Sequence, residues 1–250
     1  MQPTTRSSPK APFRSTDRST IVPDLAAGMA AAAALAFVLQ AWLATSPAWV
    51  VGSVLVYLGV AVTVYRFWSA RRGGFGWPNR VTLARAVLVA VLAGVLALPE
   101  IVQRHGAVFA ALALAALVLD GLDGWIARLF DGATRFGARF DMEVDALLIL
   151  VLSIAVVLAD RAGAWVLAIG GMRYAFVAAG RAWPWLRREL PFSRWRKFVC
   201  VAQGFVLAAA LLPWLPPALV QASLALALAA LAHSFGRDAL WLWRRRARVP

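Results

Sequence analysis

The sequence predicts an all-α fold, a polytopic membrane helical bundle of about eight transmembrane helices. Hydrophobic residues make up 62% of the 250 residues, charged residues make up only 15%, and the mean hydropathy is +0.71. Soluble domains carry about 45–50% apolar and about 25% charged residues, so lipid must cover part of this apolar excess. In such a chain the net charge of +14 is first a signal of membrane topology, and it does not indicate a nucleic-acid partner.

Eight apolar segments reach or approach the roughly 17–20 residues with which a helix crosses a bilayer. They cover residues 25–44, 48–67, 82–98, 106–122, 142–159, 164–181, 198–213 and 217–235. The first segment is longer than the apolar core of a signal peptide, which has about 7–15 residues, so a retained helix is favoured over a cleaved signal. Residues 1–22 are polar and basic, and they are predicted to form a disordered tail.

The basic residues orient these segments. With the N-terminus in the cytoplasm, the outer loops contain only Arg104 and Arg161, and nearly all other basic residues lie in inner loops or at inner helix ends. Cytoplasmic loops of membrane proteins are enriched in Lys and Arg, so this orientation is predicted and the opposite one is not. Both termini are therefore expected in the cytoplasm.

The acidic residues are concentrated where two of these segments meet the inner face. Half of the 12 fall in one window, namely Asp120, Asp123, Asp131, Asp141, Glu143 and Asp145. On a helix, Asp120 and Asp123 lie about 60° apart around the axis, and Asp141 and Asp145 lie about 40° apart. Because a short connection makes the two helices antiparallel neighbours, these four carboxylates can converge. Asp131 and Glu143 lie off the shared faces and are expected to be solvated.

Four converging carboxylates need counter-charge, since like charges repel strongly near a low-dielectric region. Divalent cations with oxygen ligands supply it in many proteins, and two such ions about 4 Å apart form the two-metal clamp of phosphoryl chemistry. Gly124, Ala127 and Gly137 leave room beside these faces, and Arg128 offers a cation for a phosphate oxygen. An ordinary ion-pair network and a proton or cation pathway are the alternatives.

These residues resemble the signature of the CDP-alcohol phosphotransferase family of integral membrane enzymes. That signature is D-x-x-D-G-x-x-A-R, eight residues, then G-x-x-x-D-x-x-x-D, and every fixed position matches between Asp120 and Asp145. More loosely, residues 78–85 resemble the segment that opens the first core helix of the family, with Asn79 as a helix cap. The resemblance places a six-helix family domain at residues 78–245 and makes residues 23–70 an additional N-terminal hairpin.

The resemblance implies a Mg²⁺-dependent reaction in which an alcohol attacks the phosphoryl group of CDP-diacylglycerol and CMP leaves. It implies two ions, with Mn²⁺ as an alternative, and an active site at the cytoplasmic face of the cell membrane. By motif position Asp120, Asp123 and Asp141 are metal ligands, and Asp145 is the general base that also touches metal. The residues implied at the donor site are Asn79, Thr82, Gly124, Arg128 and Thr134. Homodimers in the family make a homodimer the expected assembly.

The acceptor alcohol is the least determined part of this hypothesis. In the family, cations in this region hold acceptors that carry a phosphate, such as glycerol 3-phosphate or inositol phosphate. The candidates here are Arg173, within the sixth segment, and Arg194 and Lys197, which follow it. A cytoplasmic loop is basic in any case, and an acceptor without phosphate, such as serine, stays open. Transfer of phosphocholine or phosphoethanolamine from a CDP-alcohol to diacylglycerol, a cation or proton transporter, and a non-catalytic scaffold are the competing functions.

Overall fold

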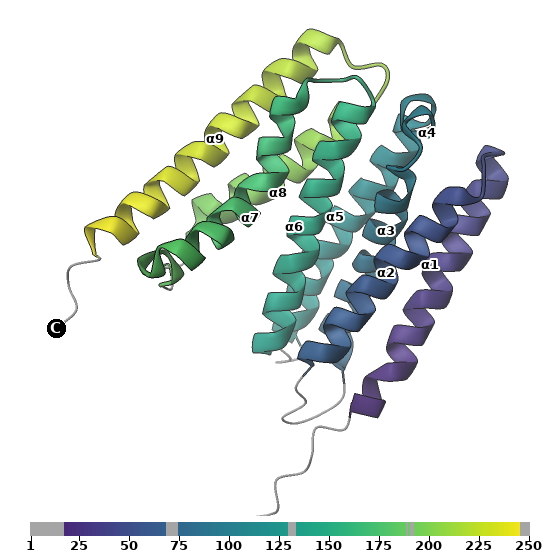
Figure 1. Cartoon of the computed structure of the whole chain (residues 1–250), viewed down its shortest axis with the longest axis horizontal. Coiled ribbons are helices and arrows are strands. Elements are labelled where there is room, and N and C mark those ends of the chain that lie inside the picture. The colour runs from purple at the N-terminus through teal and green to yellow at the C-terminus, as the bar shows by residue number, and fades with distance from the viewer. Residues whose placement is uncertain (1–17, 69–74, 130–133, 189, 191–192, 246–250) are drawn as a thin grey trace, which may run out of the picture.

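The computed structural model describes residues 18–68, 75–129, 134–188, 190 and 193–245, and for residues 18, 122–129 and 135 the description is limited to the backbone. Within these ranges eight long helices form one bundle, with α1 on one side and α9 on the other (Figure 1). They are α1 Val22–Leu43, α2 Ala48–Phe67, α3 Gly76–Val95, α5 Gly106–Leu129, α6 Arg135–Leu158, α7 Leu167–Ala182, α8 Arg194–Ala210 and α9 Pro217–Arg244. The all-α polytopic bundle is confirmed.

Each long helix coincides with one predicted segment, although several ends differ. The structure adds a short helix α4, Pro99–Arg104, and the 3-10 turns η1 Arg18–Ile21, η2 Ala164–Val166 and η3 Pro184–Arg187. Helix α6 begins well before the predicted residue 142, because its first turns are polar and hydropathy does not register them. Helix α3 begins at Gly76, so Asn79 lies inside its first turn, and the prediction of a cap at Asn79 was wrong.

Four of the described helical segments are long and apolar enough by themselves to cross a membrane, namely α1 with the end of η1, α2, α3 and α9. Among these, α3 is the central one, because 67% of its apolar stretch is buried against 28% or less in the other three. It packs against α1, α2, α5 and α6. A buried helix among lipid-facing ones is where a polar side chain can find protein partners instead of acyl chains.

The N-terminal hairpin α1–α2 packs closely on this central helix. A Cβ added to Gly94 of α3 would collide with Ser53 of α2, so the two backbones come together at small residues, as membrane helices commonly do. At the opposite end of α3, Arg80 forms an ion pair of 2.9 Å with Asp24 of α1. The division into a hairpin and a separate family domain stays a prediction, since the hairpin is continuous with the core.

Arg161, predicted in an outer loop, holds the far end of the bundle together. Its Nε donates to the carbonyl of Ala210 at 2.9 Å, and its Nη2 donates to the carbonyls of Leu212 at 3.0 Å and Leu215 at 2.7 Å. The last carbonyls of a helix have no intrahelical partner, and here the guanidinium supplies one to the end of α8. This structural use accounts for an arginine on the side of the membrane that is poor in them.

Candidate active site

Three aspartates from two helices meet at the end of the bundle where α5 finishes and α6 starts. Asp120 lies near the end of α5, and Asp141 and Asp145 lie one turn apart on α6. One carboxylate oxygen from each lies within 4.8 Å of the others, and all three residues are half-buried. Asp123 comes one turn after Asp120 on the same helix, but its side chain lies outside the described part of the chain. The structure thus brings together three of the four predicted carboxylates.

The residue that joins them is Arg85, which the sequence analysis left without a role. Its side chain is fully buried on α3. Its Nη1 lies 3.0 Å from Oδ1 of Asp120 and also contacts Asp141, and its Nη2 contacts Asp145. A signal for it was present, since an arginine within an apolar helix is costly unless it faces a polar site. The same argument applies to Arg173, which lies within the sixth predicted segment.

The charges of this cluster do not balance. One guanidinium carries a single positive charge, whereas the three carboxylates, when ionised, carry three negative charges. Carboxylate oxygens converging on one point are the ligand set that Mg²⁺ and similar hard cations prefer. The residues present therefore fit a divalent cation, and Arg85 provides part of the same counter-charge.

The first turns of α3 and α6 pack closely against each other beside the three aspartates. Asn79 is buried, and its amide nitrogen donates to the carbonyl of Phe75. A Cβ on Gly137 would lie 2.6 Å from Oδ1 of Asn79, so only a glycine lets α6 come this close. Thr134 caps α6, because its Oγ1 accepts a hydrogen bond of 2.9 Å from the backbone N–H of Gly137.

The remaining donor-site candidates lie at the same end of the bundle or cannot be placed. Thr82 is buried on α3, and its hydroxyl donates to the carbonyl of Pro78 at 3.1 Å. Gly124 and Arg128 follow Asp123 on α5, and beyond their place on that helix they lie outside the described residues. Asn79 and Thr134 both lie against Gly137, which is one turn before Asp141 on α6, and Thr82 lies one turn before Arg85 on α3.

The three acceptor candidates differ in their exposure and in their ion-pair partners. Nη2 of Arg173, on α7, lies 2.6 Å from Oε1 of Glu143 on α6, so this arginine already has an acidic partner. Lys197, near the start of α8, is exposed and interacts favourably with the charge of Asp120. Arg194 is exposed at the first residue of α8. Of the three, Lys197 has the clearest electrostatic link to the aspartates.

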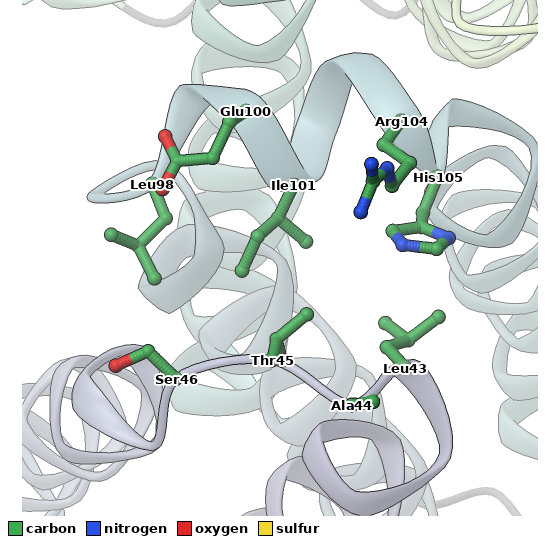
Figure 2. A pocket seen from close by; sticks show the side chains of 9 residues that line it. All are labelled: Leu43, Ala44, Thr45, Ser46, Leu98, Glu100, Ile101, Arg104 and His105. Atoms are coloured by element: carbon green, nitrogen blue, oxygen red, sulfur yellow. The ribbon is translucent and has the colours of Figure 1, made fainter.

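A pocket of about 380 Å³ lies at the far end of the bundle, away from these residues. The end of α1, the α1–α2 connection and the α4 region line it (Figure 2). Arg104 and His105 lie side by side in it, while Glu100 projects from the other end of α4 (Figure 2). None of the predicted site residues is among its lining residues, so it plays no part in the aspartate site.

Comparison with known proteins agrees with this arrangement. A model of the CDP-alcohol phosphatidyltransferase family matches residues 75–235, which is more than half of the chain and includes α3, α5 and α6. Curated relatives from Mycobacterium bovis and two strains of Mycobacterium tuberculosis, named CDP-diacylglycerol--serine O-phosphatidyltransferase, are 33% identical over 75 residues.

That alignment covers 30% of this chain and only 26% of each relative. No solved structure gives a significant match. The family match, in contrast, spans the helices that supply Arg85 and every described aspartate of the cluster. The chain is a multi-pass membrane protein and belongs to the CDP-alcohol phosphatidyltransferase family.

Proposed function

We propose that this protein transfers a phosphatidyl group from CDP-diacylglycerol to a polar alcohol, with release of CMP, as a step of phospholipid biosynthesis. The observation that carries this proposal is the convergence of Asp120, Asp141 and Asp145 at one end of the bundle, on helices inside the family match. The names of the curated relatives, which act on CDP-diacylglycerol, support the same donor.

Asp120, Asp123 and Asp141 would hold the divalent ions, with Asp145 at their edge. We expect two Mg²⁺ ions, with Mn²⁺ as a substitute, and when bound they neutralise the diphosphate and the departing CMP. Arg85 holds Asp141 and Asp145 in fixed positions through its ion pairs. The carboxylates are thereby oriented before the donor arrives, which lowers the cost of ordering them in the transition state.

Asp145 is the proposed general base. It accepts the proton of the acceptor hydroxyl as the alcohol oxygen forms its bond to the donor phosphorus and the bond from that phosphorus to the CMP oxygen breaks. We expect Asn79, Thr82 and Thr134 to contact the nucleotide, and Gly124 and Arg128 are added to the donor site by motif position. The site at a bundle end lets the donor keep its acyl chains in lipid while its nucleotide is in water.

Two classes of acceptor are compatible with this site. A phosphorylated polyol such as glycerol 3-phosphate or inositol phosphate would use the cations Arg173, Arg194 and Lys197. Serine is the second candidate, because the curated relatives are named for serine and because Arg173 is engaged with Glu143. We infer from the charge distribution that the site faces the cytoplasm with both termini on that side. A homodimer is the assembly we expect.

An acceptor panel tests the proposal. The purified full chain in nanodiscs is given radiolabelled CDP-diacylglycerol, Mg²⁺ and each acceptor in turn, and both CMP and the lipid product are identified. We expect Mg²⁺-dependent CMP release with one acceptor class and none in the presence of a chelator. Turnover of CDP-choline with diacylglycerol in place of this reaction would favour the alternative transferase. Metal-dependent cation flux in sealed vesicles without CMP release would favour a transporter.

A further inference from the structure

A second pocket lies at the aspartate end of the bundle, along the seam between the N-terminal hairpin and the family core. Its volume is about 490 Å³, within the range of about 300–1,000 Å³ that is typical of ligand sites. Helix α2 contributes Thr63, Val64 and Phe67 to one wall. Helix α6 contributes Phe136, Arg139, Phe140 and Glu143 to the other. We call it the seam pocket. Because the family match begins at residue 75, one wall lies outside the matched region.

The walls of the seam pocket are mainly apolar and aromatic. Val64 and Phe140 are buried, whereas Phe67 is 73% exposed. The ring of Phe136 stacks on Phe140 at 6.0 Å and meets the edge of Trp68 at 5.1 Å, so the aromatic side chains form a continuous surface. In a membrane protein, a surface of this kind that opens outward is filled by acyl chains rather than by water.

The two charged residues of the pocket are not equivalent. Glu143 is paired with Arg173 at 2.6 Å, so its negative charge is compensated. Arg139 is exposed and has no ion-pair or hydrogen-bond partner among the residues that the structure describes. The pocket therefore has a net positive charge beside an apolar surface, and the complementary ligand has an anionic group attached to a hydrocarbon chain. Arginine binds phosphate oxygens well because its planar guanidinium can donate two hydrogen bonds at once.

The pocket is separate from the proposed catalytic site. On α6, Arg139 and Glu143 each lie about 160° around the helix from Asp141, so they face the opposite side from the aspartates. A phosphate bound by Arg139 therefore lies on the other side of α6 from Asp141 and Asp145. The ligand of the seam pocket is thus not the donor being consumed.

We propose that the seam pocket binds one anionic phospholipid, with an acyl chain against Phe67 and Phe140 and its phosphate on Arg139. Helices α2 and α6 both pack on α3, and their ends at this side of the bundle lie next to each other (Figure 1). The bound lipid fills the space between them and attaches the hairpin to the family core. This gives the additional hairpin a specific role, namely to complete a lipid site that the core does not form by itself.

Native mass spectrometry of the full chain tests the proposal. The protein is exchanged into detergent with phosphatidylglycerol or phosphatidylcholine, and the retained lipid is counted. We expect retention of one phosphatidylglycerol in preference to phosphatidylcholine, and inorganic phosphate should not displace it. Arg139→Gln should lower the affinity about tenfold, because a charged hydrogen bond contributes about that factor. Thr63→Trp, which fills the pocket, should lower it as well.

Two matched variants control for general effects of charge and bulk. Arg66→Gln removes a charge at the same end of α2, and Val62→Trp adds the same bulk at an exposed neighbouring position; neither residue lines the pocket. Both should retain lipid as the wild type does. Unchanged retention in Arg139→Gln, or an equal loss in Arg66→Gln, would overturn the proposal. CMP release in detergent with excess donor should be unaffected in Arg139→Gln, so failure here is distinguishable from failure of the proposed function.

Discussion

Each end of the bundle contains an arginine that contacts three oxygen-bearing groups. The groups are backbone carbonyls at one end and carboxylates at the other. Arg161 donates to the carbonyls of Ala210, Leu212 and Leu215, which are neutral and are satisfied by the contact. Arg85 contacts the carboxylates of Asp120, Asp141 and Asp145, whose negative charge it only partly balances. The burial of an arginine is thus no sign of function by itself. The uncompensated charge around Arg85 is what marks the candidate site.

The largest effect is expected at the proposed base. Asp145→Asn removes the proton acceptor with little change in shape, so CMP release should fall about 10²–10⁴-fold. Asp160→Asn at the far end, where the carboxylate accepts a hydrogen bond of 3.0 Å from Gln103, is the matched control and should keep its activity. Radiolabelled turnover measures both variants, and wild-type activity in Asp145→Asn would remove the assigned role.

Arg85→Gln should show the charge imbalance directly. Breaking a buried ion pair by removing one partner costs about 3–5 kcal/mol, so thermal unfolding with a chelator present should occur at a much lower temperature than in the wild type. Mg²⁺ should restore a large part of this loss, since a bound divalent cation stabilises the folded state and replaces the missing positive charge. A variant that is destabilised equally with and without Mg²⁺ would mean that Arg85 only packs the core.

Arg161→Gln is the corresponding test at the end of the bundle far from the aspartates. The variant leaves carbonyls of the α8–α9 connection without their donor, at a cost of about 1–3 kcal/mol. Because no carboxylates are involved, Mg²⁺ should leave the unfolding temperature of this variant unchanged relative to the wild type. If Arg161→Gln responded to Mg²⁺ as Arg85→Gln does, the proposed difference between the two ends would be wrong.

Effects on stability as large as that of Arg161→Gln are expected at two tightly packed glycines. A Cβ at Gly137 would collide with Asn79, and a Cβ at Gly106 would collide with the carbonyl of Leu211 at the far end. Alanine at either position should therefore destabilise the fold by about 1–3 kcal/mol. Only Gly137→Ala displaces α6 from α3 at the candidate site, so it alone should raise the KM for the donor. Steady-state kinetics at several donor concentrations separate the two variants.

The comparison also shows what the sequence can and cannot predict. Hydropathy located the eight long helices, and helical spacing brought Asp120, Asp141 and Asp145 to one place. Arg85 was missed because its three partners lie 35, 56 and 60 residues away in the chain, and the period of one helix says nothing about its neighbours. The seam pocket could not be predicted for the same reason, since it depends on how α2 and α6 pack against α3.

The position of Arg85 has a consequence for the biogenesis of the protein. Synthesis proceeds from the N-terminus, so α3 enters the membrane before the aspartates of α5 and α6 exist. A lone arginine in a membrane-spanning helix raises the free energy of translocon insertion by up to about 2.5–3.5 kcal/mol. The hairpin is already present by then and offers α3 a protein surface at Ser53 and Gly94. We expect that deleting the hairpin reduces insertion of α3 in a glycosylation-mapping assay, and that Arg85→Leu restores it.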